Sequence, residues 1–226
     1  KKTKLISIVH LAGWPADMQQ ICNLAKSYNL KMVEDCSQAH GAKLRINNEW
    51  QSVGSFAEIG TWSFCTDKII STGGEGGMIT TNYHNLWDNI WSIKDHGKTL
   101  SSISRKNHPI GYRWVHEKIG TNYRLTEMQS AIGRIQLRNL SEMHFKREKN
   151  ALILRNELKD ISYLRLPFPP NNSIHAWYKF YIYIKPSALK NDWSRDRIIK
   201  EISQLGYPCF SGGCGEIYLE KGIKEL

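Results

Sequence analysis

The pattern that most restricts this sequence is an apolar strand, a helix and a second apolar strand within its first 35 residues. Residues 5–9 are a short apolar, β-rich run, and residues 31–33 are a second one that leads to Asp35. The residues between them have apolar side chains at helical spacing, with Pro15 near the start. A unit of this kind joins two parallel strands of one sheet. Asp35 therefore lies at the carboxyl edge of a parallel strand, where open α/β sheets bind ligands.

The remaining apolar runs predict further strands and helices, and hence an α/β fold. Alternating, aromatic and β-branched patterns predict a hairpin at 43–53 and strands at 61–65, 78–81 and 177–184, and residues 163–166 lead into a proline-rich turn. Spacings of three and four predict helices at 86–93, from 126 to about 158 and at 195–205. We place a domain boundary near residue 145, so that residues 1–145 form a large domain and residues 146–226 begin a smaller one.

The composition indicates a globular protein without a membrane segment. The 226 residues are 41% hydrophobic and 11% aromatic, which is enough for a sizeable core. No apolar run approaches the roughly 20 residues of a membrane span. The basic start leads into only five apolar-rich residues, which are too few for a signal peptide. We therefore expect a cytoplasmic protein.

The cysteines favour neither disulfides nor a metal site. Their number, five, is odd, and they have no paired spacing, so we expect reduced thiols. Cys209 and Cys214 are loosely spaced, and no second pair of His or Cys accompanies them. We therefore expect no bound metal.

The positive charge is concentrated in the middle of the chain. Of the formal net charge of +10, residues 101–160 contribute 12 Lys and Arg against 6 Asp and Glu, whereas residues 1–100 are almost balanced, with 10 against 9. We first expect a solvated basic surface and second the attraction of a small phosphorylated substrate. Nucleic acid comes third, because no block of like charge and no basic-aromatic motif accompanies the excess.

An acid, a lysine and a glycine cluster follow one another between residues 33 and 77. Asp35 ends one apolar strand, Lys68 follows the next, and the glycine cluster lies at 73–77. A pyridoxal phosphate site needs these parts, since a lysine amine forms the Schiff base and a carboxylate keeps the pyridine nitrogen protonated. Each part alone is a weak signal. Asp35 fits a helix cap equally well, and the glycines lack the spacing of a P-loop or a dinucleotide motif.

Several motifs in the same order strengthen this interpretation. They are the acid motif Glu-Asp-x-x-Gln-x-x-Gly at 34–41, the lysine segment from Ser63 through Lys68 with the glycines up to 77, and segments at 9–13, 95–97 and 120–127. In this order the chain resembles the sugar-nucleotide aminotransferases of the DegT/StrS type, of the fold-type-I (aspartate aminotransferase-like) pyridoxal phosphate superfamily. The resemblance implies an α/β large domain, with a mostly parallel sheet and helices on both faces, followed by part of a smaller α+β domain.

The resemblance also implies roles for particular residues. Lys68 would be the Schiff-base lysine and the acid/base that moves the proton. Asp35 would pair with the pyridinium nitrogen, and Gln38 would lie near the phenolic oxygen of the ring. Ser63 would bind the cofactor phosphate. Asn122 would reach the phosphate in a partner subunit's site, which implies a homodimer with shared active sites.

Three further residues are candidates for lining the substrate site. They are His96, His10 and Glu75, and a structural histidine is at least as good an interpretation for each of the two histidines. Lys68 also argues against the dehydratase branch that resembles these enzymes, because that branch has histidine in place of the lysine.

The function implied by the resemblance is transfer of an amino group from an amino acid, expected to be glutamate, to a 3- or 4-keto hexose of a nucleotide sugar. The amino sugar would serve lipopolysaccharide or O-antigen synthesis, or natural products. An alternative is a non-catalytic regulator of the same fold that binds pyridoxal phosphate or a sugar nucleotide. The presence of both Lys68 and Asp35 speaks against it. We expect neither nucleic acid nor membrane as a partner.

Two departures from the family pattern stand out. Asp67, directly before the lysine, is not the commonest neighbour there, which leaves the substrate class open. The family also has a segment that supplies a phosphate-binding helix start and an aromatic ring stacked on the cofactor, and we expect it before Leu5. We expect the C-terminal domain to continue beyond the last residue, so that the chain is an internal portion of a longer polypeptide.

Overall fold

The computed structural model describes residues 2–107, 110–213 and 215–225 and divides into two compact units. Unit 1 comprises Lys1–Leu152 and Pro169–Phe180, and unit 2 comprises Ile153–Phe168 and Tyr181–Leu226. The polypeptide therefore passes between the units three times. Cys214, one of the two cysteines considered above as metal ligands, lies outside the described residues.

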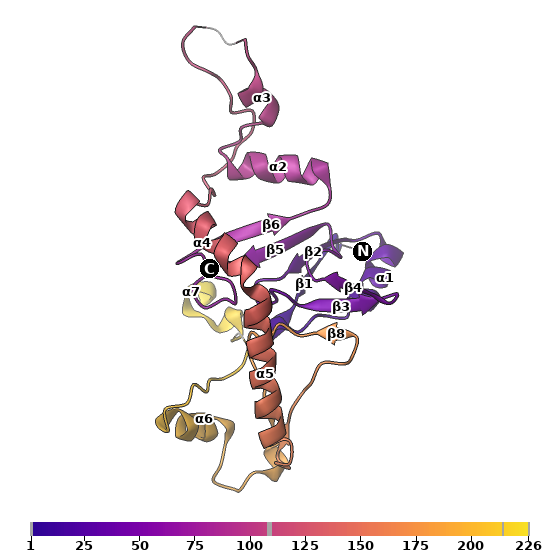
Figure 1. The fold of residues 1–226 in the computed structure, drawn as a ribbon, viewed down its shortest axis with the longest axis vertical. Coiled ribbons are helices and arrows are strands. Elements are labelled where there is room, and N and C mark those ends of the chain that lie inside the picture. The colour runs from indigo at the N-terminus through magenta and orange to yellow at the C-terminus, as the bar shows by residue number, and fades with distance from the viewer. Residues whose placement is uncertain (1, 108–109, 214, 226) are drawn as a thin grey trace. The chain divides into compact units, whose positions relative to one another are not determined.

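The main sheet of unit 1 contains the predicted strand–helix–strand unit. Its strands are β1 (Leu5–Val9), β2 (Lys31–Asp35), β5 (Ile59–Ser63) and β6 (Gly77–Thr80), which lie side by side in that order (Figure 1). The first three are parallel, and β6 is antiparallel to β5. Helix α1 (Met18–Tyr28) crosses from β1 to β2. It begins after Asp17, whose side chain accepts the N–H of Gln20, and ends at Asn29 in the left-handed conformation. The parallel crossover and the α/β fold are confirmed.

A second, antiparallel sheet contains the predicted hairpin. Strands β3 (Lys43–Ile46) and β4 (Glu49–Ser52) are joined by Asn47 and Asn48, which have φ angles of 51° and 67°. Two successive positive φ angles match the twist of the flanking strands, and asparagine tolerates them. The short strand β8 (Ser173–Ile174) pairs with β3 on its other side. Residues 169–180 are thereby attached to unit 1.

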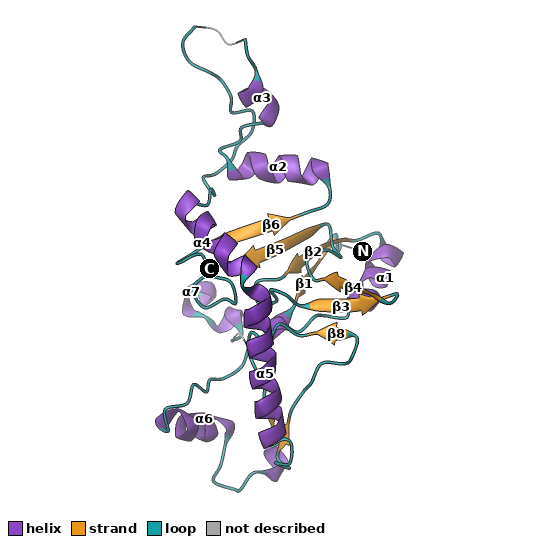
Figure 2. Cartoon of the chain, in the orientation of Figure 1, coloured by secondary structure: helices purple, strands orange, loops and turns teal. Residues whose placement is uncertain are grey.

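The helices of the middle region are α2 (His84–Lys94), α3 (Leu100–Ser104), α4 (Glu127–Arg138) and α5 (Leu140–Leu158) (Figure 2). The single helix predicted from residue 126 to about 158 is interrupted at Asn139. Helix α3 lies in the connection between α2 and α4. In the described part of the chain, no helix combines the length and the apolar character that a membrane crossing requires.

Two buried clusters form the core of unit 1. One joins Ile8, Met18, Ala25 and Met32 of the strand–helix–strand unit to Leu44 of β3. The other gathers small and aromatic side chains from distant segments, namely Cys36, Ala39, Ala42, Val53, Ile69, Ala176 and Tyr178. Because this second cluster includes the neighbour of Lys68, it supports the loop that carries the lysine.

Unit 2 has little regular structure. Strands β7 (Leu164–Arg165) and β9 (Tyr183–Ile184) pair antiparallel, and α6 (Arg195–Gln204) begins after Ser194, whose hydroxyl accepts the N–H of Arg197. The remaining elements are short: η2 (Pro186–Ala188), η3 (Ile217–Leu219) and α7 (Lys221–Lys224).

The strand predicted at 177–184 is wrong over most of its length. Only Tyr183 and Ile184 are in a strand, and Trp177 has a φ of 53°, which a strand cannot contain. Trp177, Tyr178 and Phe180 belong instead to unit 1, where the Trp177 ring stacks with the rings of His175 and Phe180.

Candidate active site

Asp35 and Ser63 end two neighbouring parallel strands, so they lie at the same edge of the sheet. Asp35 is the last residue of β2 and pairs in register with Thr61 of β5, two residues before Ser63. One carboxylate oxygen of Asp35, Oδ1, accepts the N–H of Ser37 at 3.0 Å. The Ser63 hydroxyl accepts the N–H of Cys65 at 3.4 Å. The carboxylate and the hydroxyl are thus placed at the ligand-binding edge of an open sheet.

Gln38 lies beside the turn that follows β1. Its Oε1 accepts the N–H of Ala12 at 2.6 Å, and Ala12 belongs to the single turn η1 (Leu11–Gly13). The N–H of His10 donates to the carbonyl of Asp35 at 3.1 Å. The two loops that leave β1 and β2 are therefore fixed to each other at this edge.

Lys68 lies on a loop between β5 and β6 whose two ends are fastened together. Phe64 N–H donates to the carbonyl of Gly76 at 2.8 Å, and Thr72 N–H donates to the carbonyl of Phe64 at 3.2 Å. The Lys68 ammonium lies 3.2 Å from Oδ1 of Asp67, and its side chain is 17% exposed. Burial lowers the pKa of Lys68, but the hydrogen bond to Asp67, together with the interactions with Tyr178 and the charge of Asp67, raises it above its ordinary value.

Glu75 lies in the glycine turn of the same loop. Its Oε1 accepts from Sγ of Cys65 at 3.3 Å, and its carbonyl accepts from Nε2 of Gln129 in α4 at 2.6 Å. The turn is therefore fixed to the start of α4, and the Glu75 carboxylate points toward the first residues of the lysine loop.

His96 and Asn122 are brought together by two chain segments that approach closely. Asp95 and Asn122 form a β-bridge, and Arg124 donates to Oδ1 of Asn122 at 3.1 Å and to Nε2 of His96 at 3.3 Å. Gly97 makes the approach feasible, because a Cβ there would lie 1.6 Å from the carbonyl oxygen of Lys118, at a φ of +78°. Among the described residues, no hydrogen bond or ion pair joins this cluster to Lys68.

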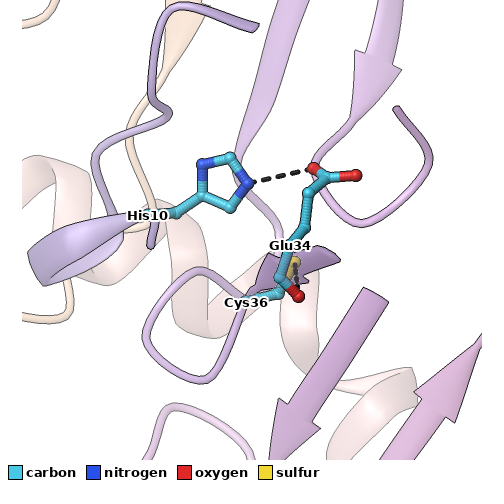
Figure 3. A group of neighbouring side chains, drawn as sticks. All are labelled: His10, Glu34 and Cys36. Atoms are coloured by element: carbon cyan, nitrogen blue, oxygen red, sulfur yellow. Dashed lines mark hydrogen bonds and ion pairs between the residues drawn. The ribbon is translucent and has the colours of Figure 1, made fainter. Parts of the chain in front are cut away.

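His10 is not placed to line a substrate site. Its side chain is fully buried. Its Nδ1 accepts the N–H of Ala16 at 3.0 Å, so the ring proton is on Nε2, which donates to Oε2 of Glu34 at 3.0 Å. Both ring nitrogens are thus used inside the protein, which favours the structural interpretation of His10; Figure 3 shows its bond to Glu34.

Glu34 is a buried carboxylate held by a full set of donors. Besides His10, it accepts the backbone N–H groups of Gly54, Phe56 and Ala57 at 2.7–2.8 Å. Burial raises the pKa of Glu34, but the hydrogen bonds from His10, Gly54 and Ala57 together lower it below its ordinary value. The side chain therefore stays ionised in the interior.

The cluster of His10, Glu34 and Cys36 does not fit a metal ion. Its candidate ligand atoms lie within 4.8 Å of one another (Figure 3). However, the donors described above already occupy the His10 nitrogens and the Glu34 oxygens. Burial, followed by the charges of Glu34 and Asp35, raises the pKa of the Cys36 thiol, so the thiolate that a metal requires is disfavoured. The cluster is structural.

His40 is a buried neighbour of the site that contributes no charge. The centre of its ring lies 5.4 Å from the centre of the Trp62 ring and 5.9 Å from the centre of the Phe64 ring. Burial first, and the charge of Lys68 second, lower the pKa of His40 to about 4. The ring is therefore neutral at neutral pH.

Sequence reasoning did not assign roles to several residues of this region. In the sequence, Asp67 differs from the family pattern, and Glu34 and Arg124 belong to motifs that assign them no function. Tyr178, whose hydroxyl donates to Oδ2 of Asp67, is 111 residues away in the sequence. No local signal identifies such a partner.

The side chains at this edge fit pyridoxal phosphate by their chemistry. Lys68 offers an amine for a Schiff base, Asp35 offers a carboxylate for a pyridinium nitrogen, and the Ser63 hydroxyl is a donor for a phosphate. Lys68 and Ser63 belong to one strand and the loop that follows it, and Asp35 ends the adjacent strand.

The protein is an α/β protein of the class of fold-type-I aminotransferases. Three features place it there: the strand order, the parallel crossover and the lysine loop. The aminotransferase from Psychrobacter cryohalolentis has a similar structure, with a TM-score of 0.89 and 50% sequence identity. The match covers 98% of this chain and 57% of that one. The chain belongs to the DegT/DnrJ/EryC1/StrS aminotransferase family, whose model matches residues 1–207.

Curated relatives act on nucleotide sugars, according to their names. The chain is 38% identical over 160 residues to the GDP-perosamine synthase of Escherichia coli O157:H7. The matched residues make up 71% of this chain and 40% of the relative. It is 34% identical over 183 residues to the UDP-N-acetyl-3-dehydro-alpha-D-glucosamine 3-aminotransferase of Acidithiobacillus ferrooxidans. Here the matched residues make up 81% of this chain and 45% of the relative. The chain spans about half the length of the curated relatives it matches.

Proposed function

We propose that the full-length protein is a pyridoxal phosphate-dependent aminotransferase. It moves an amino group from an amino acid, glutamate, to a 3- or 4-keto hexose of a nucleotide sugar. The observation that carries the proposal is the placement of Asp35 at the carboxyl end of β2 and of Lys68 on the loop that follows the adjacent parallel strand β5. Family membership and the names of the relatives support the substrate class.

The roles of the side chains are those that the family implies, and the chemistry of Lys68, Asp35 and Ser63 supports them. When bound, pyridoxal phosphate carries the amino group and withdraws electrons from the carbon that gains or loses a proton. Lys68 joins the cofactor through its amine and, when free, moves that proton. Asp35 holds the ring nitrogen protonated, because an adjacent carboxylate raises the pKa of a pyridine nitrogen. Ser63 binds the phosphate, and Gln38 lies near the phenolic oxygen.

The second group of residues acts at the substrate or across subunits in this proposal. Asn122 reaches the phosphate in the partner subunit's site, so the active enzyme is a homodimer. The exposure of Asn122 and its fixed geometry beside Arg124 and His96 support this role. His96 and Glu75 line the substrate site. His10 has no such role, because it is buried and satisfied.

The domain assignment is also part of the proposal. Residues 1–145 belong to the cofactor-binding large domain, and residues 146–226 begin the small domain. All the candidate site residues lie in unit 1, which supports the first half of this assignment. The compact unit itself extends to Leu152 and also includes the returning segment Pro169–Phe180.

The setting of the enzyme completes the proposal. The amino sugar serves lipopolysaccharide or O-antigen synthesis, and the enzyme acts in the cytoplasm. It binds neither nucleic acid nor membrane.

The direct test of the activity uses the full-length protein, glutamate and a panel of 3- and 4-keto nucleotide sugars. We expect mass spectrometry to detect one amino sugar nucleotide, and Lys68→Ala to lower the rate by at least about a thousandfold. The matched control is Lys200→Ala, an exposed lysine of α6, which leaves the rate unchanged. Binding of a sugar nucleotide without turnover of any of them would favour the non-catalytic regulator instead.

A further inference from the structure

Lys68 lies next to a carboxylate that is adjacent to it in the sequence. Neighbouring residues do not face each other on a helix, and they point to opposite faces of a strand. Here the chain turns after Cys65, where Lys68 N–H donates to the Cys65 carbonyl at 3.1 Å. The turn brings the Lys68 ammonium within 3.2 Å of Oδ1 and 3.5 Å of Oδ2 of Asp67. The ammonium is therefore held by both oxygens of one carboxylate.

Tyr178 fixes that carboxylate from the other side. Its hydroxyl donates to Oδ2 of Asp67, and the Lys68 ammonium lies 5.3 Å from the centre of its ring. This distance is within the range of a cation–π contact. Asp67 is 54% exposed, whereas Tyr178 is only 9% exposed. A buried tyrosine thus holds a carboxylate that is itself half exposed.

The segment that carries Tyr178 is itself firmly attached to unit 1. Ala176 N–H donates to the carbonyl of Gly13 at 2.8 Å, and Lys179 N–H donates to the carbonyl of Ala12 at 3.2 Å. Arg147 of α5 donates to the carbonyl of Trp177 at 3.1 Å. Backbone contacts on both sides of Tyr178 therefore determine where its hydroxyl lies.

The electrostatics of the group agree with this geometry. The hydrogen bond from Tyr178, with further help from Lys68, lowers the pKa of Asp67 to about 2. Burial raises the pKa of Tyr178, and the bond to Asp67 raises it further. Asp67 is therefore ionised, and Tyr178 keeps its proton, across the neutral range.

Other titratable groups face Lys68, Asp67 or Tyr178 from the neighbouring elements. They are His40, Cys65, Arg147 and Lys179, and also Glu75, which contacts Cys65. His40 is neutral, and Arg147 and Lys179 face Tyr178. Asp67 is the anion in direct contact with the ammonium.

We propose that Asp67, oriented by Tyr178, is a positioning residue that holds the Lys68 ammonium whenever the lysine is not joined to the cofactor. This inference rests on the proposed role of Lys68. An amine that must move a proton between carbon atoms works best when it is held in one place while free. In return, Asp67 lowers the fraction of neutral amine, because a nearby carboxylate favours the charged form.

The test measures the reactivity of Lys68 in the full-length protein freed of pyridoxal phosphate. Acetic anhydride acetylates only neutral amines, and peptide mapping reports the rate at Lys68 as a function of pH. We expect Asp67→Asn to raise this rate at pH 8 by roughly three- to fivefold and to shift the pH profile to lower pH. The matched control, Asp88→Asn, removes an exposed carboxylate that pairs with His84, and it leaves the Lys68 profile unchanged. An unchanged Lys68 profile in Asp67→Asn would overturn the proposal.

A second variant isolates the part played by Tyr178. Tyr178→Phe keeps the ring beneath the ammonium and removes only the hydroxyl that orients Asp67. Because Asp67 keeps its charge, we expect a faster reaction at Lys68 than in the wild type but a slower one than in Asp67→Asn. A profile identical to that of the wild type would contradict the orienting role of Tyr178.

A parallel measurement separates failure of this inference from failure of the proposed function. Borohydride reduction of the full-length protein with its cofactor marks the residue that forms the Schiff base. Marking of Lys68 together with an unchanged acetylation profile in Asp67→Asn would refute the inference alone. Marking of another lysine would refute the role of Lys68, and with it the inference, even if Asp67→Asn alters the acetylation profile.

Discussion

Glu34 and Asp35 are adjacent acids with opposite environments, because side chains alternate across a strand. Glu34 is fully buried, and its carboxylate joins β2 to the loop at 54–57 and to His10. Asp35 points to the other face and lies at the edge of the sheet, with one oxygen bonded to Ser37. The first acid holds the strands and loops together, so that the second can be presented to a ligand.

Replacing Glu34 by glutamine should therefore destabilise the fold. Glutamine keeps the shape, but its amide nitrogen faces backbone donors and leaves them unsatisfied. We expect the free energy of unfolding at neutral pH to fall by about 3 kcal/mol. Chemical denaturation of the full-length protein measures the change. Glu142→Gln, which alters an exposed ion pair with Lys146, is the control and leaves the midpoint unchanged.

The same residue predicts a dependence of stability on pH. The pKa of Glu34 is lower in the folded chain than its ordinary value of 4.5. Its contribution to stability is therefore fully present above the unfolded pKa and is lost as the pH falls through the folded pKa. We expect the difference in stability between the wild type and Glu34→Gln to shrink below about pH 4.5. A difference that stays constant down to pH 3 would contradict this account of Glu34.

At the scale of elements, helix α4 links the glycine turn to the rest of the fold. Thr126 and Gln129 form a capping box at its start, and the Gln129 amide also donates to the carbonyl of Glu75. The cap thus stabilises the helix and the turn at 73–77 together. The sequence Thr-Glu-Met-Gln made the start of this helix predictable, because the capping box is a local signal.

Removing the cap should loosen both elements. We expect Thr126→Ala to lower the stability by about 1 kcal/mol, because a backbone donor of the first turn loses its acceptor. Thr126→Ser keeps the hydroxyl and should retain most of the wild-type stability. Thermal unfolding of the full-length variants measures both. Equal losses in the two variants would show that the methyl group, and not the cap, matters.

The elements that could not be predicted depend on long-range packing. The strand–helix–strand unit, the Asn47-Asn48 hairpin and the lysine loop follow from local patterns, and the structure confirms them. The stretch at 177–184 has the composition of a strand, but Trp177 takes a positive φ and the segment packs against η1 and α5. Tyr178 reaches Asp67 only because of that packing. Local propensity carries no information about such a partner.

At the scale of the whole molecule, the proposal requires two subunits for each active site. Lys68 and Asn122 would act in the same pocket from different chains, as a C2 dimer allows. Two inactive variants should then complement each other. Coexpression of Lys68→Ala with Asn122→Ala should restore up to about a quarter of the wild-type activity, because half of the randomly paired dimers contain one intact site of two.

The control for complementation is coexpression of Lys68→Ala with Asp35→Ala. Both of these changes fall in the same chain's half of the site, so the mixed dimer has no intact site. Recovery in this pair, or its absence in the first pair, would contradict the shared pocket.

The central claim is that Lys68 is the residue that holds pyridoxal phosphate. Borohydride reduction of the full-length protein with bound cofactor, followed by peptide mapping, tests it most directly. We predict one phosphopyridoxyl group, on Lys68, and none in Lys68→Ala. A group on any other lysine, or no group at all in a protein that binds the cofactor, would contradict the account.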